Sequence, residues 1–355
     1  FYVSVAAVIA ALLAFAMWRY SGGKKDEGSG QGGDGYVDPN IVKQLAEDPT
    51  GTDGVTTVKE YSFEPAKMLD PVPGAADYKS IGKNRVVKMA INVWAGWAPI
   101  IYANGGKGPG KIWKDSSGKD FRVELVLIDD PIHMGNTFAA GDVHLGWATV
   151  DMLPLVVQRL NRDPRTMPRV VQQIDWSNGG DGIVSRAEIK EVRDLRGKTV
   201  ALAQNSPSHY FLLNMLLNSG VQPSEVKMEF TKDAFQAAAA FNADKKYAAV
   251  VTWAPDIYKL SEISGNKMLV NTLTANKLIA DVWFARADFA RDDPEIIEGL
   301  VRGIFDAMVE LKDDKNKETG GKQMDDVYGL PPGTGNSMLA DAHWTNYAEN
   351  RDFFL

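Results

Sequence analysis

The chain has 355 residues and a mass of 38.9 kDa, enough for about two globular units. With 45% hydrophobic and 24% charged residues, its composition excludes both wholesale disorder and a protein of many membrane spans. The net charge of −7 and the lack of a basic stripe argue against a nucleic-acid partner. The chain has no cysteine and only 4 histidines, no two of them within one helical turn, so neither a metal site nor a cofactor is predicted.

The first element is an apolar segment. Residues 1–18 (FYVSVAAVIAALLAFAMW) contain a single serine and no charge, and as a helix they span roughly 27 Å, about one hydrocarbon core. Ala14-Phe15-Ala16 has the form of a signal-peptidase site, so one interpretation is a removable export signal. We expect instead a retained transmembrane anchor over residues 1–20.

A linker and an arm follow the apolar segment. Residues 21–35 (SGGKKDEGSGQGGDG) are dominated by glycine and contain nothing apolar, which predicts a flexible linker. Residues 36–85 are rich in proline, aspartate and glycine. We expect them to form an extended arm, with one short helix from Pro39 to Glu47, laid against the part of the chain that follows.

From residue 86 onward, runs typical of strands and of helices alternate. The strand-like runs are 86–93, 121–128, 170–175, 182–186, 199–204 and 248–253, and residues 143–153 begin as a strand and pass into a helix towards Leu160. The helical runs are 129–142, 206–218, 230–244 and 293–311. This alternation predicts an α/β fold with mostly parallel sheets, in which ligands bind beyond the carboxyl ends of the strands. The segments at those ends are 94–99, 147–151, 204–209 and 252–256.

An ordered set of segments gives the chain a resemblance to a known family. They are INVWAGWAPIIYANGG, VELVLIDDP, AAGDVHLGWATVDM, QIDWSNGGDGIVSR, LRGKTVALAQNSPSHYFLLNMLL, AAVVTWAPD and LIADVWFARADFARDDPEIIEGLV. Together they resemble periplasmic substrate-binding proteins of the nitrate/sulfonate/taurine ABC-transporter type, over residues 86–355. The chain departs from that pattern at His144-Leu145-Gly146, where the family usually has an acidic residue, and in its retained anchor.

The resemblance implies a two-lobed periplasmic-binding-protein fold of type II-like topology, preceded by one transmembrane helix. Lobe 1 would comprise residues 86–178 and 275–355, and lobe 2 residues 179–274. Two interlobe crossovers, near 176–182 and 270–284, would let the lobes close on a solute by a hinge. The residues that the resemblance places in the cleft are Trp94, Gly96, Trp97, Thr149, Ser177, Asn205, Ser206, Ser208, His209 and Trp253.

The residue types at these positions suit more than one kind of ligand. A helix that starts after Ser206, with Pro207 in its first position, would direct N–H groups at an anion. Tryptophans near the strand ends would wall an apolar pocket or stack on a cation: Trp94, Trp97, Trp147 and Trp253. Some acidic residues could bind a cation, although helix caps and hinge hydrogen bonds explain them equally well: Asp151, Asp175, Asp181 and Asp256. We expect a small anion or zwitterion, held at the Ser206 helix start.

The sequence favours binding over catalysis. It contains no G-x-S-x-G, H-E-x-x-H or EF-hand loop, and GGKGPGKI (105–112) lacks the hydroxyl residue that a P-loop needs after its lysine. We therefore expect a binding protein that captures a small-molecule solute for ABC-type uptake, with an ABC permease and the membrane as partners. The alternative is a structural or regulatory subunit of a membrane complex that keeps the binding fold without transport and continues into a peptidoglycan-binding domain.

A solute-capturing cleft is useful only on the side from which solute arrives. We therefore expect a single-pass inner-membrane protein with its main domain in the periplasm. Arg19, Lys24 and Lys25, directly after the span, oppose this orientation, because positive charge is normally scarce on the outer side.

Overall fold

The computed structural model describes residues 71–355. The predicted anchor (1–20), the linker (21–35) and most of the arm lie outside these residues. Within residues 71–355, no helix is both long enough and apolar enough to span a bilayer. The described end of the arm has no regular structure, and backbone hydrogen bonds hold it against the chain that follows. The N–H of Ala76 donates to the Ala139 carbonyl oxygen at 3.0 Å, and that of Lys79 to the Gly141 carbonyl oxygen at 2.9 Å.

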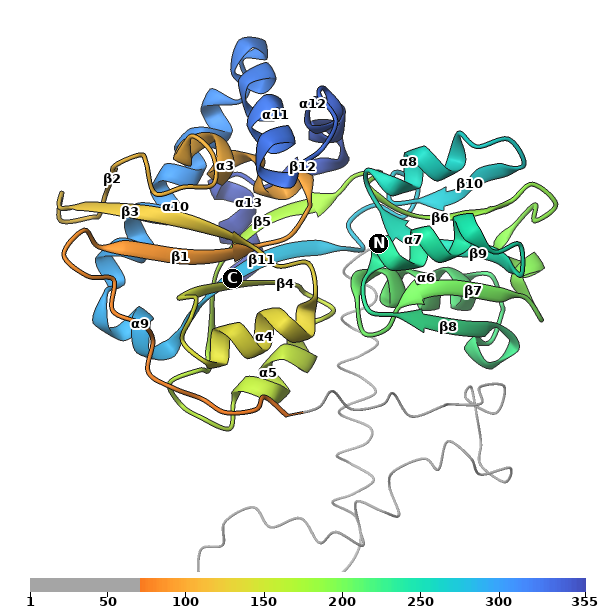
Figure 1. Ribbon diagram of the computed structural model, residues 1–355, viewed down its shortest axis with the longest axis horizontal. Coiled ribbons are helices and arrows are strands. Elements are labelled where there is room, and N and C mark those ends of the chain that lie inside the picture. The colour runs from red at the N-terminus through yellow and green to blue at the C-terminus, as the bar shows by residue number, and fades with distance from the viewer. Residues whose placement is uncertain (1–70) are drawn as a thin grey trace, which may run out of the picture. The chain divides into compact units, whose positions relative to one another are not determined.

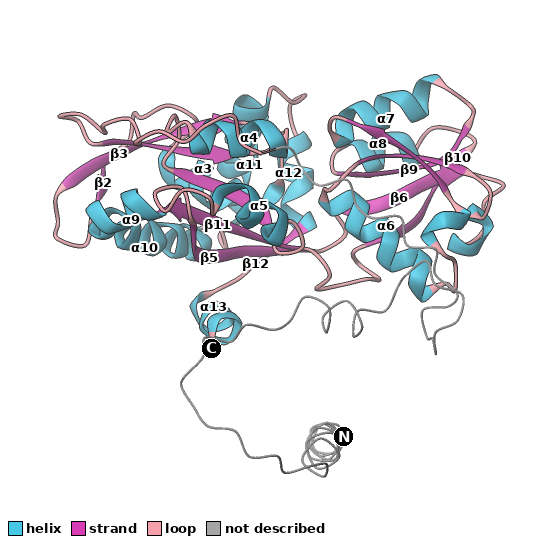
Figure 2. Cartoon of the chain, turned by 90° about the horizontal axis from the view of Figure 1, so that it is seen from below, coloured by secondary structure: helices cyan, strands magenta, loops and turns pink. Residues whose placement is uncertain are grey.

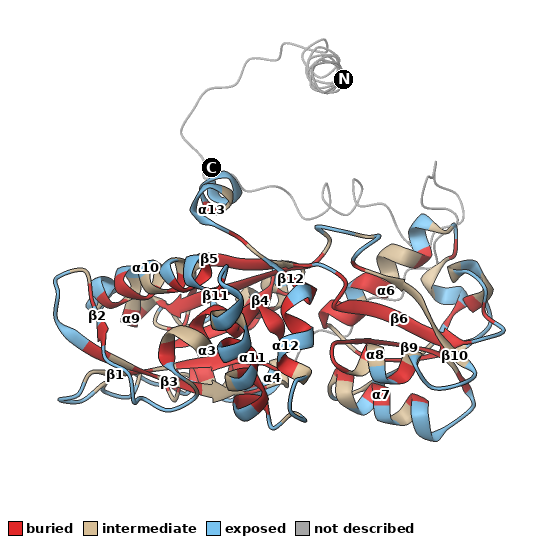
Figure 3. Ribbon diagram, turned by 90° about the horizontal axis from the view of Figure 1, so that it is seen from above, coloured by how far each residue is buried: buried red, intermediate tan, exposed pale blue. Residues whose placement is uncertain are grey.

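The first of two sheets has the strand order β12-β5-β11-β4-β1-β3-β2 (Figure 1). Its strands are β1 (Val86–Ile91), β2 (Trp113–Lys114), β3 (Asp120–Leu127), β4 (Leu145–Thr149), β5 (Pro168–Ser177), β11 (Ala280–Arg286) and β12 (Ala342–Trp344). β4 is buried at every position and β1 over its last three residues, whereas β3 alternates buried apolar residues with half-buried ones (Figure 3). Both patterns are typical of strands, which is why the sequence located them.

Helices cover this sheet on both faces (Figure 2). They are η1 (Ala95–Trp97), α3 (Ala98–Asn104), α4 (Pro131–Ala139), α5 (Leu153–Leu160), α9 (Ala287–Asp292), α10 (Pro294–Glu310), α11 (Asp314–Tyr328), α12 (Thr334–Met338), η4 (Leu339–Asp341) and α13 (Tyr347–Phe354). We refer to this sheet and these helices as lobe 1. The segment after β1, which we expected to be a loop, turns directly into η1 and α3, with Pro99 in the first turn of α3.

The second sheet and its helices form lobe 2. The strand order is β10-β6-β9-β7-β8, from β6 (Asp181–Arg186), β7 (Thr199–Ala203), β8 (Lys227–Thr231), β9 (Tyr247–Trp253) and β10 (Asn266–Asn271). The helical segments are η2 (Val192–Leu195), α6 (Pro207–Asn218), η3 (Pro223–Glu225), α7 (Ala234–Ala243) and α8 (Asp256–Ser261). Part of its apolar core, around Phe211, Leu212 and Val251, forms a separate cluster, whereas other buried residues of lobe 2, such as Phe241 and Val250, belong to the cluster that includes the core of lobe 1.

The sheets are more mixed than the sequence predicted. β1 pairs in parallel with β3 and β4, and β7 with β8 and β9. The strands that lead from one sheet to the other pair antiparallel within their sheets: β5 and β11 in the first, β6 and β10 in the second. Consecutive parallel strands of one sheet must be joined by a long connection, usually a helix. A strand that leads directly into the other sheet needs no such connection, so it can pair antiparallel.

The chain passes between the lobes at residues 178–180 and 272–279, and Thr272 joins the two crossovers. Its hydroxyl lies 2.8 Å from the Ser177 hydroxyl and accepts the Gly179 N–H at 2.7 Å. Its own N–H donates to the Asp181 carbonyl oxygen at 3.0 Å. Thr272 is fully buried, so these bonds form away from water and fix the two crossovers side by side.

Candidate functional site

A cavity lies at the carboxyl ends of the lobe 1 strands, and both lobes line it. The free space within it is about 10 Å³, enough for roughly one water molecule. Lobe 1 contributes Asn92, Trp94, Trp147, Thr149 and Asp281, lobe 2 contributes Asp181, Pro207 and Trp253, and the second crossover contributes Ile279. We call this space the inner cavity. A solute larger than water would enter it only when the lobes part or the lining side chains move.

Two carboxyl groups and a hydroxyl stand in a row on adjacent strands of lobe 1. Thr149 on β4 pairs with Asp281 on β11, and Asp281 pairs with Asp175 on β5. Directly opposed residues on neighbouring strands project to the same face of the sheet, so the three side chains are neighbours. Asp175 is 0% exposed and Asp281 4%, and the Thr149 hydroxyl oxygen has no hydrogen-bond partner among residues 71–355.

Trp94 covers the Asp175 end of this row. Its indole N–H donates to Oδ2 of Asp175 at 3.1 Å, while Oδ1 is buried without a hydrogen-bond partner in the described part of the chain. Gly96 permits this approach, because a Cβ at that position would lie 1.6 Å from Oδ2 of Asp175. Gly180, in the first crossover, packs on the other side of the indole, where a Cβ would lie 2.4 Å from the ring.

The indole N–H group of each inner-cavity tryptophan donates a hydrogen bond to another group of the protein. Besides Trp94, Trp147 donates to the Ile128 carbonyl oxygen at 3.1 Å, and Trp253 donates to the Val93 carbonyl oxygen at 3.1 Å. These indoles therefore have no hydrogen bond left for a ligand and can offer it only their ring surfaces.

Further carboxyl groups surround the row. Asp181 begins β6 opposite Trp253 and lines the inner cavity, and Asp341 lies near it at the end of η4. Oδ1 of Asp341 accepts the hydroxyl of Tyr258 on α8, a contact between the lobes, while its Oδ2 is buried without a partner among the described residues. Asp151, after β4, completes the group. We call Asp151, Asp175, Asp181, Asp281 and Asp341 the acidic cluster.

Burial raises the pKa of every member of the acidic cluster. It raises the pKa of Asp181 to about 7, with a further contribution from the charges of Asp151 and Asp341. Burial, together with their mutual repulsion and that of Asp181, holds the pKa values of Asp175 and Asp281 above the ordinary range. No lysine or arginine of residues 71–355 acts on any of these pKa values. Buried carboxylates are usually paired with a cation, so this arrangement is unusual.

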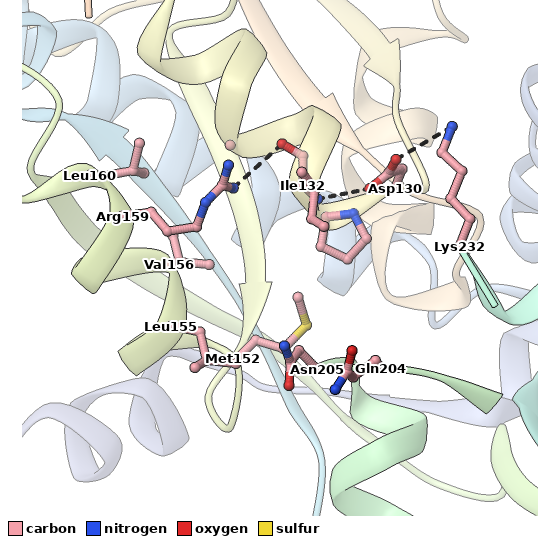
Figure 4. A pocket seen from close by; sticks show the side chains of 12 residues that line it. Asp130, Ile132, Met152, Leu155, Val156, Arg159, Leu160, Gln204, Asn205 and Lys232 are labelled. Atoms are coloured by element: carbon pink, nitrogen blue, oxygen red, sulfur yellow. Dashed lines mark hydrogen bonds and ion pairs between the residues drawn. The ribbon is translucent and has the colours of Figure 1, made fainter. Parts of the chain in front are cut away.

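A second pocket adjoins the contact between the lobes further out (Figure 4). Its lining comes from α4 and α5 of lobe 1 and from the segments before α6 and α7 of lobe 2. An ion pair joins the two sides: Nζ of Lys232 lies 3.5 Å from Oδ2 of Asp130, whose Oδ1 also caps α4 through the N–H of Ile132. Arg159 on the lobe 1 side donates to Oδ1 of Asn136 at 2.8 Å. We call this the outer pocket.

The structure distributes the ten residues expected in the cleft over different environments. Trp94, Thr149 and Trp253 line the inner cavity, and Asn205 lines the outer pocket. Trp97 is buried in the lobe 1 core, where its N–H donates to Oδ1 of Asn92 at 2.6 Å. Four others support the site's surroundings through packing or hydrogen bonds: Gly96, Ser177, Ser206 and His209. Ser208 is fully buried, and its hydroxyl has no hydrogen-bond partner among residues 71–355.

The protein's own groups occupy part of the start of α6. Pro207 is in the first position as predicted, but it has no N–H, and the N–H of His209 donates to the Ser206 carbonyl oxygen at 3.0 Å. The Ser206 hydroxyl donates to the Ala203 carbonyl oxygen at 2.7 Å and does not cap the helix. Nδ1 of His209 accepts the Asn205 N–H at 3.2 Å, which orients the ring within the protein.

Asp281, Asn92 and Ile279 are cavity residues that the sequence analysis missed, and for Asp175 and Asp181 it left cation binding and cap or hinge contacts as alternatives. The signal was present: each of Asp175 and Asp281 interrupts a strand that is otherwise apolar or uncharged, QQIDWS and LIADVWFA. A carboxyl group in a buried strand needs a partner or a ligand, so these positions could have been singled out.

Two α/β lobes that exchange the chain twice and enclose a cavity between them define the two-lobed periplasmic-binding-protein fold. The NMT1/THI5-like family matches residues 121–315, over half of the chain, and the protein belongs to this family.

Known proteins similar to the chain include binding proteins for small oxyanions and sulfonates. Over 188 residues it is 28% identical to the taurine-binding periplasmic protein of Escherichia coli (strain K12), a match that covers 52% of this chain and 56% of the relative. The chain thus spans little more than half the length of that relative.

Solved structures of low sequence identity share the fold. The periplasmic aliphatic sulphonate binding protein SsuA from Escherichia coli superposes with a TM-score of 0.57 at 17% identity, covering 74% of this chain and 87% of that one. The periplasmic nitrate-binding protein NrtA from Synechocystis PCC 6803 gives a TM-score of 0.55 at 14% identity, covering 73% and 70%.

Proposed function

We propose that the protein is an extracytoplasmic solute-binding protein of an ABC-type import system, which captures a small solute in the inner cavity and delivers it to a permease. The observation that supports this most directly is a cavity with walls from both lobes, since such a cavity forms only when the lobes come together. Membership of the NMT1/THI5-like family and similarity to the taurine-binding protein point the same way.

The contacts between the lobes support capture by closure. The N–H of Trp253 in lobe 2 reaches the Val93 carbonyl oxygen in lobe 1, Lys232 pairs with Asp130, and Tyr258 donates to Asp341. Buried apolar residues of both lobes, among them Trp94 and Trp253, also belong to one hydrophobic cluster. A solute that binds only the closed form would shift the protein further towards it.

Binding is tested with the full chain in detergent or lipid nanodiscs, by thermal unfolding in the presence of small amines, sulfonates, amino acids and nitrate. A ligand of the inner cavity raises the unfolding temperature in a concentration-dependent manner, because it binds the folded form only. Solute capture would be contradicted if no compound of the panel and no extract of the growth medium raised the unfolding temperature.

The role in import is tested separately by purification from native membranes. Recovery of an ABC permease and ATPase with the protein supports the proposal. A stable membrane complex without either supports the structural or regulatory role instead. Protease cleavage within residues 21–35 in intact spheroplasts tests our further proposal that residues 1–20 anchor the protein in the inner membrane with its main domain in the periplasm.

A further inference from the structure

We propose that the solute bound in the inner cavity carries a positively charged nitrogen, an ammonium or a comparable organic cation, which pairs with the carboxylates of Asp281 and Asp181 among the cavity tryptophans. This inference rests on the proposed function, because it specifies the class of solute for the same cavity.

The charged groups that reach the cavity are carboxyl groups. Asp281 and Asp181 line it. Asp281 is only 4% exposed, and its carboxyl group makes no hydrogen bond with any described residue. The Thr149 hydroxyl beside it is also buried without a partner in the described part of the chain. Carboxylates accept hydrogen bonds and cannot donate them once ionised, so they match a ligand with N–H donors.

The tryptophans favour the same charge. Trp94, Trp147 and Trp253 line the cavity, and each N–H is already bonded to the protein. The indoles therefore offer no donor to an anion, whereas a cation is attracted to the negative face of an indole ring. Both kinds of cavity wall therefore select for positive charge.

A metal ion fits the site less well than an organic cation. No group of three or more acidic or histidine side chains within residues 71–355 converges closely enough to hold a metal. The aromatic walls of the cavity instead suit a small organic group around the charged nitrogen.

The acidic cluster also predicts that binding is coupled to proton release. The groups facing Asp281 are Asp175 on β5, Asp181 on β6 and Asp151 after β4, and Asp341 and Tyr258 adjoin Asp181. Without a cation, burial and repulsion favour the protonated forms of these carboxyl groups. A cation favours the ionised forms, so its binding displaces protons and strengthens as the pH rises from about 5.5 to about 8.

The experiment is isothermal titration calorimetry of the full chain with probes of one shape and different charge: butylammonium, butan-1-ol and butanesulfonate, with taurine as the zwitterion. We expect the amine to bind at least about tenfold more tightly than the alcohol, as charged hydrogen bonds commonly allow. Titrations in two buffers of different ionisation enthalpy should show net proton release at about pH 7. Binding of butanesulfonate alone overturns the inference and leaves the proposed function intact, whereas binding of no probe and no other solute overturns both.

Variants connect the result to the cavity. Asp281→Asn keeps the shape of the side chain and removes its charge, and it should weaken binding of butylammonium about tenfold or more while leaving butan-1-ol unaffected. Asp326→Asn, at an exposed position of α11, is the matched control and should bind like the parent. Thermal unfolding shows that each variant is folded. Should Asp281→Asn fail to fold, Asp181→Asn gives the same test, and unchanged binding of the amine by a folded variant refutes the inference.

Discussion

Gly96 determines how closely η1 approaches β5, because its missing side chain leaves room for the bond between Trp94 and Asp175. In Gly96→Ala the new Cβ would lie 1.6 Å from Oδ2 of Asp175 and 2.7 Å from the Trp94 indole nitrogen. We expect this overpacking to lower the free energy of unfolding by about 1–3 kcal/mol. Urea denaturation measures the loss. Gly108→Ala, where no atom lies within 4 Å of the new Cβ, is the control and should change stability little.

The acidic cluster predicts an inverted dependence of stability on pH. Burial raises the pKa of Asp181 to about 7, and the pKa values of Asp175 and Asp281 are raised as well. The folded chain then holds protons that an unfolded carboxyl group releases above about pH 4. Because the folded state binds more protons, the free energy of unfolding of the ligand-free protein should fall as the pH rises from about 4 to about 8.

Asp281→Asn should remove part of this dependence and stabilise the ligand-free protein at about pH 8 by about 1–2 kcal/mol. Urea denaturation at about pH 5 and about pH 8 measures both effects, with Asp326→Asn as the control. A parent protein whose stability rises over this interval would show that the carboxyl groups are ionised and paired in the folded state.

At the scale of elements, Thr272 is the side chain that joins the two crossovers. Thr272→Val keeps its shape but loses the hydroxyl that contacts Ser177 and accepts the Gly179 N–H. We expect the variant to lose about 1–3 kcal/mol of stability, since a buried N–H is left without a partner. Thr274→Val, at an exposed position of the same crossover, should lose much less. Equal losses would mean that the hydroxyl bonds of Thr272 are unimportant.

Elements that depend on local sequence patterns could be predicted from the sequence, whereas arrangements that depend on pairing between distant strands could not. The strands and α6 depend on local apolar patterns and on Pro207, so both could be located from the sequence. The arrangement of Asp281 beside Asp175 depends on the pairing of β11 with β5, whose paired positions lie far apart along the chain. No local pattern contains that register. For the same reason the hydrogen bonds that occupy Ser206 and the tryptophan N–H groups could not be predicted, and the start of α6 looked more open than it is.

For the whole molecule, the ion pair between Lys232 and Asp130 connects the lobes at the outer pocket. The Lys232 side chain is 64% exposed, so the pair is screened by salt and contributes little. Lys232→Met should weaken solute binding by less than about fivefold at low salt, and this difference should disappear at high salt. Lys245→Met, in an exposed position of lobe 2, should bind as the parent does under both conditions. A large loss that is independent of salt would give Lys232 a direct role in holding the solute.

Gly180 places the first crossover directly against the Trp94 ring, so a rotation of the backbone there also moves the indole that shields Asp175. Separating the lobes therefore admits water to the acidic cluster, and hydrated carboxyl groups return towards their ordinary ionised state. The entrance between the lobes therefore carries more negative charge in the open form than in the closed form. This charge attracts cationic solutes over a distance of about one Debye length, roughly 8–10 Å at moderate salt. Capture should thus be fast and sensitive to ionic strength, whereas release, which requires the lobes to part first, should be slow and nearly insensitive to it.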